Sequence, residues 1–488
     1  MVITVGLLAG AIALLAWGLY RNLPYGKLGI VAWLQTLVLM LPWLVVFGSL
    51  SFGIGLNFAA VLFGLVFSIV AYVVLGRWLR SLAATTDLPL PSAVSGRSEL
   101  GPATGEAATP TAPTEKPTLP AEDLQAIQSI FSVDTYFATD YLPYKGGVIC
   151  PGNLRGEAKA VHQQLTERLQ AALPDRYRLF MVPNGEGKPM VVILPIATEP
   201  IRSGNLQKLA AVFLAVATLG TCLETSAVLQ GFSLLGNPSA GLFQRSLPFA
   251  LGLFGIAAVR ELGHWLMAKR YRARLGPPIF LPAWQLGTFG AFTRLESFLA
   301  NRSQLFDIGA VGAIAAGSVS LLVLVVGLAL SPTAQGLEVP TLFFQGSILV
   351  GTIAKLFLGQ QLQSEVVMVH PLVILGWLGL IMTALNLMPA GQLDGGRIVQ
   401  AIYGSKTARR VTVITLLVLG LVAIVNPLAL YWALVILLLQ REVDQPSLDE
   451  ITEPDDTRAS LGLLLLFLMA ATLIPMAPGL AGRLGIGG

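Results

Sequence analysis

Long apolar stretches, separated by shorter polar ones, dominate the 488 residues of this sequence. A helix needs about 20 mostly apolar residues to cross a bilayer, and many of these stretches approach that length. The predicted spans lie near residues 2–18, 28–50, 54–76, 207–230, 246–269, 305–330, 371–388, 411–425, 427–440 and 459–477; the pair around Asn426 and Pro427 could instead form one kinked helix. The pattern therefore predicts an α-helical multi-pass membrane protein.

One polar region interrupts the spans. It consists of a linker followed by a soluble domain, so that the chain has four parts in all. Residues 81–121 are rich in Pro, Ala, Thr and Gly without periodicity, which is typical of a flexible linker. Residues 122–203 carry two helical patterns and two short apolar strands about an NGEGK turn, which predicts a small soluble α+β domain. We therefore expect N-terminal transmembrane helices at 1–80, then the linker and the soluble domain, and a membrane-embedded core at 204–488.

Two apolar segments of the core lack the pattern of a span. Residues 276–300 are interrupted by Gly and Pro, which suits a membrane-associated β-hairpin or a re-entrant loop. Such a backbone is stable at membrane depth only where protein or water covers its polar groups. Residues 342–362 are similarly ambiguous.

Composition and charge agree with a membrane protein. Charged residues make up only 12% of the chain, against roughly 25% in a soluble domain, and the net charge is +4. The basic residues lie beside apolar stretches, as in the run from Lys269 to Arg274. They therefore indicate how the spans are oriented in the membrane, and they do not suggest a nucleic-acid partner. By the positive-inside rule these ends, and with them the soluble domain, are expected in the cytoplasm. With only two cysteines, Cys150 and Cys222, the sequence excludes a disulfide framework and a thiolate metal site.

The first candidate site lies in the predicted span at 246–269, where the chain reads VRELGHWLMAKRY. Arg260, Glu261 and His264 differ from the zinc-protease helix motif H-E-x-x-H only at the first position, where Arg stands in place of His. Residues i and i+4 share one helix face, so Arg260 and His264 point the same way. Ionisable residues inside a membrane are costly and by default functional. The alternative is that these residues meet water at the cytoplasmic end of the helix.

The second candidate site follows the predicted span at 371–388 and reads NLMPAGQLDGGRI. Asp394 lies there in a glycine-rich break, with Asn386 and Pro389 upstream. Taken alone, the segment could be an interfacial turn in which Asp394 forms an Asx-turn.

Together the two motifs resemble the site-2 protease family of intramembrane zinc metalloproteases, which pair H-E-x-x-H with a downstream N-x-x-P-x-x-x-L-D-G. The second motif is complete here, whereas the first lacks its leading His. FSVDTYFATDYLPYKGGVICPGNLRG, GPPIFLPAWQLGTFGAFTR, QLDGGRIVQAIYG and ITEPDD are similar to the ethylene-dependent gravitropism-deficient and yellow-green branch of chloroplast and cyanobacterial membrane proteins. The resemblance runs from about residue 122 to near the C-terminus and implies a site-2 protease-like core.

This resemblance assigns roles residue by residue. His264 and Asp394 match metal ligands, Glu261 matches the catalytic base, and Asn386 matches a residue that helps to hold substrate or the oxyanion. Arg260 occupies a degenerate ligand position. A second departure is GAIAAG at 312–317, where family members often have Pro after the first Gly. The implied cofactor is zinc, if the protein is active.

Arg260 cannot replace the missing zinc ligand, because its guanidinium stays protonated and has no acceptor lone pair. We therefore predict that Arg260 replaces the metal as the cation and forms a bidentate salt bridge with Asp394 or with Glu261. Asp394 is favoured, since sequence neighbours point apart on a helix. The rival interpretation is that Arg260 extends toward water. His162 is expected to be an exposed helix residue and His370 an interfacial one, so neither is expected to supply the ligand.

Three functions are compatible with these features. The first is an intramembrane zinc metalloprotease that cuts membrane proteins, with Glu261 as base and 276–300 presenting substrate as an added strand, although Arg260 is expected to impair hydrolysis. The alternative is a catalytically inactive, protease-like protein that binds membrane partner helices. A transporter is a remote third, since nothing suggests an inverted repeat.

The N-terminal sequence bears on the membrane in which the protein lies. A cyanobacterial plasma or thylakoid membrane is favoured over a plastid, because no Arg- and Ser-rich transit peptide precedes the first span.

Glu224, which lies within the predicted span at 207–230, is expected either to form structural hydrogen bonds or to line the cavity.

Overall fold

The computed structural model describes residues 119–487, except residues 186, 201, 237, 284, 285, 334, 335, 424, 425, 440 and 441, together with scattered positions between 19 and 78. The chain divides into two units, residues 1–107 and residues 108–488. In the first unit the described positions are helical. The predicted spans at 2–18, 28–50 and 54–76 and the predicted linker at 81–121 lie wholly or largely outside the described residues.

A small α+β domain precedes the membrane core. Its elements are α4 (Ala121–Ser129), β1 (Tyr136–Ala138), β2 (Leu142–Tyr144), β3 (Gly147–Leu154), α5 (Ala158–Ala172), β4 (Tyr177–Pro183) and β5 (Pro189–Pro195). The antiparallel strands follow the order β1-β3-β5-β4, with β2 beside β3. The two helices and two of the strands match the predicted patterns closely.

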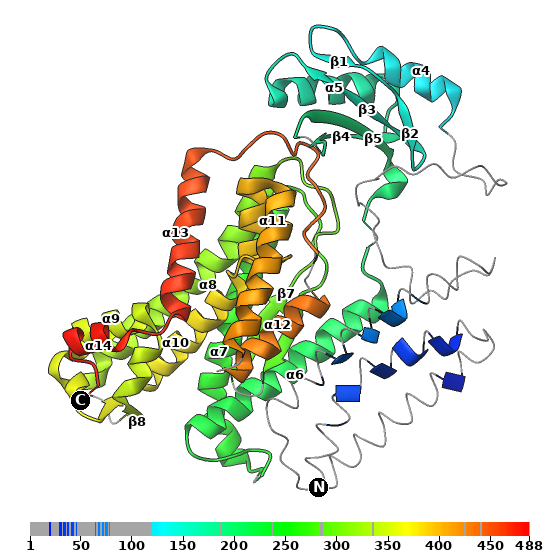
Figure 1. Cartoon of the computed structure of the whole chain (residues 1–488). Coiled ribbons are helices and arrows are strands. Elements are labelled where there is room, and N and C mark those ends of the chain that lie inside the picture. The colour runs from blue at the N-terminus through cyan, green and yellow to red at the C-terminus, as the bar shows by residue number, and fades with distance from the viewer. Residues whose placement is uncertain are drawn as a thin grey trace. The chain divides into compact units, whose positions relative to one another are not determined.

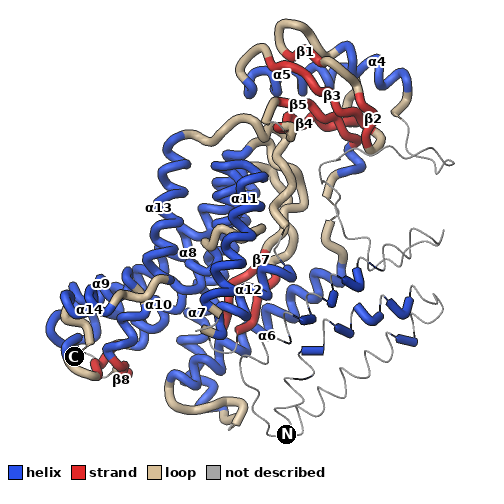
Figure 2. Tube along the Cα trace, in the orientation of Figure 1, coloured by secondary structure: helices blue, strands red, loops and turns tan. Residues whose placement is uncertain are grey.

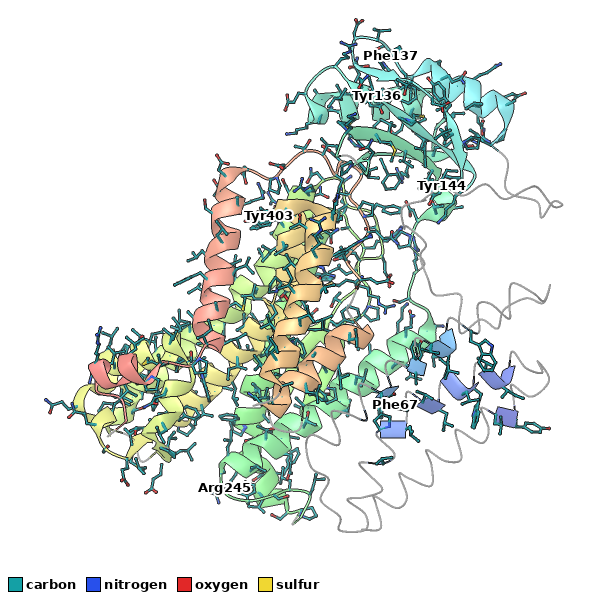
Figure 3. All side chains as sticks on the ribbon, in the orientation of Figure 1. Phe67, Tyr136, Phe137, Tyr144, Arg245 and Tyr403 are labelled. Carbon is teal, nitrogen blue, oxygen red and sulfur yellow. The ribbon has the colours of Figure 1, made fainter. Side chains whose placement is uncertain are left out.

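One face of this sheet carries the core of the domain. Alternate residues of β3, β4 and β5, such as Val148, Met181 and Ile193, are buried together with Ile127 of α4 and Leu165 of α5. Figure 1 shows both helices on this face. On β1 the same alternation holds for the two neighbours labelled in Figure 3: Tyr136 is fully buried, whereas Phe137 is exposed. The period of two along each strand therefore decides which side chains enter the core.

Helices make up most of the core that follows the soluble domain. They are α6 (Asn205–Leu229), α7 (Ala240–Arg270), α8 (Arg302–Leu330), α9 (Ile348–Leu358), α10 (Pro371–Asn386), α11 (Asp394–Val422), α12 (Pro427–Leu439), α13 (Asp456–Leu473) and α14 (Pro478–Leu484), with 3-10 turns η2 (Ile196–Thr198), η3 (Ser331–Thr333), η4 (Thr341–Gly346) and η5 (Gly359–Gln363). Within the described part of the chain, α6, α7, α8 and α13 are long and apolar enough to cross a membrane. The expected multi-pass helical membrane protein with a small α+β domain is thus confirmed.

Three predicted segments differ in detail. The span expected at 371–388 is the 16-residue helix α10, and the ambiguous segment 342–362 contains α9, whose 11 residues rise only about 17 Å and cannot cross a bilayer core of about 30 Å. The span expected at 411–425 is the second part of α11, which Gly404 interrupts with a φ of 81°. α11 ends at Val422 and α12 begins at Pro427, and residues 424 and 425 between them lie outside the described residues.

A β-hairpin lies among these helices, as the Gly- and Pro-rich segment 276–300 predicted. It pairs β6 (Ile279–Ala283) with β7 (Gly287–Phe292), and every residue of β7 is buried. Figure 2 shows its strands between helices, and β7 contacts α6, α7 and α10. A second short pair joins β8 (Leu337–Pro340) to β9 (Val366–Val369).

The loop that precedes α13 connects the soluble domain to the core. Met181 of β4 donates to the carbonyl of Leu448 at 2.7 Å, and Glu450 donates back to the carbonyl of Met181 at 2.9 Å. The same loop pairs with the chain after β7, because Leu448 donates to the carbonyl of Leu299 at 2.8 Å. This pairing brings the preceding Asp444 beside α11.

Candidate functional site

The two sequence motifs meet inside the helical core. Arg260, Glu261 and His264 lie on α7, Asn386 is the last residue of α10, and Asp394 is the first residue of α11. All five are buried, with exposed fractions of 3%, 8%, 1%, 2% and 0% respectively. From Arg260 to the end of α7 at Arg270 the helix rises about 15 Å. The alternative that these residues simply meet water at a helix end is therefore wrong.

Arg260 forms the predicted bidentate salt bridge with Asp394. Its Nε donates to Asp394 Oδ2 at 2.8 Å, and its Nη2 donates to Asp394 Oδ1 at 2.7 Å. A planar guanidinium matches a carboxylate in this way better than any other side chain does. The rival interpretation, in which Arg260 extends toward water, is wrong.

Arg260 also contacts the neighbouring carboxylate, which corrects one step of the sequence argument. Its Nη1 donates to Oε1 of Glu261 and, at 2.7 Å, to the main-chain carbonyl of Ala291 on β7. Sequence neighbours leave a helix in different directions, but the long arginine side chain brings its guanidinium back to Glu261. The other oxygen of Glu261 accepts from the hydroxyl of Thr293. Both oxygens of Glu261 are therefore engaged.

His264 lies between the same two carboxylates. Its Nε2 is 3.3 Å from Asp394 Oδ1 and its Nδ1 is 3.5 Å from Glu261 Oε1, but neither nitrogen has a partner in hydrogen-bond geometry among the described residues. The ring fits because Gly312 of α8 has no side chain: a Cβ there would lie 2.1 Å from Nε2. The first glycine of GAIAAG thus makes room for the imidazole.

Asn386 holds the hairpin against α10. Its Nδ2 donates to the carbonyl of Phe289 at 2.9 Å and to the carbonyl of Met382 at 2.8 Å. Gly290, with a φ of 95°, allows this approach, because a Cβ there would lie 2.7 Å from the amide nitrogen. The amide group is therefore committed to protein carbonyls in this structure.

Sequence reasoning missed a second buried ion pair beside the first. Arg397 Nε donates to Asp444 Oδ2 at 2.7 Å, and its Nη2 donates to the carbonyl of Thr293 at 2.7 Å. The sequence does contain a signal for Arg397 as a site residue, because it follows Asp394 by three positions and therefore lies on the same helix face. The sequence contains no such signal for Asp444, because this residue reaches α11 only through the pairing of its loop with β4 and with the chain after β7.

The other two histidines and Glu224 lie in separate places. His162 is half-buried beside Asp449, so the expectation of an exposed residue is wrong. Burial lowers the pKa of its imidazole, while Asp449 acts in the opposite direction. His370 caps α10, accepting from the main-chain N–H of Leu372 at 3.2 Å. Glu224 accepts from the Ser233 hydroxyl at 2.6 Å and from two main-chain N–H groups of the same turn, which makes it a structural hydrogen-bonding residue.

The residues present do not fit a catalytic zinc ion. Such a site needs three protein ligands and one open position. Here His264 and Asp394 are the available pair, while the guanidinium of Arg260 is bonded to both carboxylates. Within the described part of the chain, no group of three or more His, Cys, Asp or Glu side chains could hold a metal ion.

Comparisons with known proteins identify the family. Residues 248–425 match the model of peptidase family M50, and residues 125–200 match the EGY3 middle domain. The Arabidopsis thaliana protein named "Probable zinc metalloprotease EGY1, chloroplastic" is 34% identical over 403 residues, which cover 75% of this chain and 74% of that protein. This chain belongs to the EGY family of peptidase family M50. The resemblance to site-2 proteases is thereby confirmed.

Other EGY relatives align over similar lengths. "Probable zinc metalloprotease EGY2, chloroplastic" of Arabidopsis thaliana is 38% identical over 363 residues, covering 73% of this chain and 65% of the relative. "Probable zinc metallopeptidase EGY3, chloroplastic" of the same plant is 31% identical over 385 residues, covering 74% and 67%. The chain thus spans just under two thirds of the EGY2 relative. No solved structure matches the chain.

Proposed function

We propose that this EGY-family protein keeps the scaffold of an intramembrane protease, binds membrane partner helices, and has lost or greatly reduced hydrolysis. The observation that carries the proposal is the buried guanidinium of Arg260, which is bonded to Asp394 and to Glu261. In this interpretation Arg260 occupies the position of a metal ligand and supplies the positive charge that a metal would otherwise bring.

The chemistry of the site supports this interpretation at two points. A zinc site built on His264 and Asp394 would lack its third ligand, and a fixed cation beside them repels a second one. A general base must also lie within hydrogen-bond reach of the water that it deprotonates. Glu261, the proposed base, instead accepts from Arg260 and from Thr293.

An active zinc metalloprotease is the second candidate. Membership of the family and the names of the relatives favour it. In that case His264 and Asp394 would be metal ligands, Glu261 the base and Asn386 the residue that holds substrate, and Arg260 would have to leave both carboxylates.

The setting of the protein is part of the same proposal. The relatives are named as chloroplastic, which supports a photosynthetic membrane but does not favour a cyanobacterial one. A cyanobacterial plasma or thylakoid membrane stays part of the proposal. The basic run after α7 supports a cytoplasmic soluble domain. The proposed division is N-terminal helices at 1–80, linker at 81–121, soluble domain at 122–203 and core at 204–488.

The test is the zinc content of the full chain, purified in detergent and dialysed against a mild chelator. We expect close to no zinc in the wild type and about one zinc per chain in Arg260→His, because the substitution completes a three-ligand set. Adding Asp394→Asn to Arg260→His is the matched control and should abolish the gain. About one zinc in the wild type would contradict the proposal and restore the active protease as the leading candidate.

A further inference from the structure

The edge of β7 that faces the site is occupied by side chains. Carbonyls of alternate residues along a strand point to the same side. Along β7 and the residue that follows it, three such carbonyls each accept from a different helix: Asn386 Nδ2 to Phe289 at 2.9 Å, Arg260 Nη1 to Ala291 at 2.7 Å, and Arg397 Nη2 to Thr293 at 2.7 Å. The three donors come from α10, α7 and α11, which carry the two motifs.

An extended peptide binds a sheet by pairing its main chain with the main chain of an edge strand. The central carbonyl of this edge, that of Ala291, receives a guanidinium that is also bonded to Asp394 and Glu261. Moving this group aside would break its bonds to two buried carboxylates, which is costly. The guanidinium of Arg260 therefore occupies the position from which a main-chain N–H of an added strand would donate to the carbonyl of Ala291.

We propose that Arg260 closes the site-facing edge of β7 to extended peptides, independently of its effect on metal binding. Asn386 and Arg397 hold the two ends of this edge and are themselves anchored, to the carbonyl of Met382 and to Asp444 respectively. The inference rests on the proposed function, because it concerns how a partner uses the same site. A partner of the wild-type protein binds as an intact transmembrane helix, without an unwound segment paired to β7.

The test uses the full chain in detergent with excess chelator, so that metal plays no part. The probe is a fluorescent six-residue peptide of alternating Val and Thr with blocked ends. The main variant is Arg260→Met, Glu261→Gln, Asp394→Asn, which removes the guanidinium without leaving a buried carboxylate uncompensated. Arg260→His in chelator is the second variant, and it decides the question alone if the triple variant does not fold. The matched control is Asp307→Asn with Arg458→Met, which removes a bidentate pair of the same geometry between α8 and α13.

We expect both Arg260 variants to bind the peptide about tenfold more tightly than the wild type, since the carbonyl of Ala291 at the centre of the edge becomes free to accept one main-chain hydrogen bond from the peptide. A benzophenone in the peptide should crosslink to residues 287–293. The control pair should bind like the wild type. No gain in a folded Arg260 variant, or an equal gain in the control, would overturn the inference. The zinc measurement decides the proposed function separately, because it is made without excess chelator.

Discussion

Two arginines of this protein bind an aspartate with the same bidentate geometry, and their surroundings differ. Arg260 meets Asp394 at 2.8 and 2.7 Å, and Arg458 meets Asp307 at 2.7 and 2.8 Å. The first pair has side chains only 4% and 0% exposed, whereas those of the second are 31% and 14% exposed. The first pair lies inside the core, and the second joins α8 to α13 near the starts of both helices.

The comparison shows that the geometry of a salt bridge does not by itself decide how much stability is lost when one partner is removed. An ion pair in contact with water contributes at most about 1 kcal/mol, because water solvates either partner when the other is removed. Removing one partner of a buried pair leaves a charge that nothing solvates. Arg260 therefore acts as a fixed part of the core, while Arg458 adds a modest link between helix ends.

The largest expected effect comes from Arg260→Ala. The substitution leaves Asp394 and Glu261 buried without their cation and should lower the free energy of unfolding by about 3–5 kcal/mol. Arg458→Ala is the matched control and should cost about 1 kcal/mol or less. Denaturant unfolding of the full chain in detergent micelles measures both. Equal losses for the two variants would remove the distinction between the pairs.

The next effect concerns packing beside the buried pair. Gly312→Ala places a Cβ 2.1 Å from His264 Nε2 and should cost about 1–3 kcal/mol through overpacking. Gly317→Ala in the same helix places its Cβ 3.5 Å from Thr383, an ordinary contact, and should be neutral or slightly stabilising. Melting temperatures of the two variants compare them directly. A harmless Gly312→Ala would show that the imidazole is free to move, contrary to a tightly packed site.

The smallest effect is expected outside the membrane helices, at His162. Because burial lowers its pKa in the folded state below the ordinary 6.5, the unfolded chain binds the proton more readily. Stability is therefore complete above about pH 6.5 and falls as the pH drops through it, by up to about 1 kcal/mol per pH unit. Hydrogen exchange of β4 between pH 7.5 and 5.5 measures the loss. In His162→Gln the corresponding slope should be shallower; an unchanged slope would assign the loss to other groups.

Much of the architecture was predictable from local patterns. Apolar length located α6, α7, α8 and α13, and the alternation in YRLFMVP and PMVVILPI located β4 and β5. The Gly- and Pro-rich interruption at 276–300 indicated the hairpin. These predictions succeed because a bilayer span and a half-buried strand are recognised from neighbouring residues alone. The shorter helices were less predictable: α10 stops at Asn386, and Gly404 bends α11.

The sequence by itself determined which chemical groups enter the site: a permanent cation at position 260, two carboxylates and one imidazole. It also predicted the pairing of Arg260 with Asp394, because a buried carboxylate without a metal requires another cation. Only the tertiary structure decided that the same guanidinium reaches Glu261 and the carbonyl of Ala291, that Arg397 meets Asp444, and that His162 is half-buried. Those contacts join segments far apart in the chain or depend on how one long side chain folds back, and helix packing sets both.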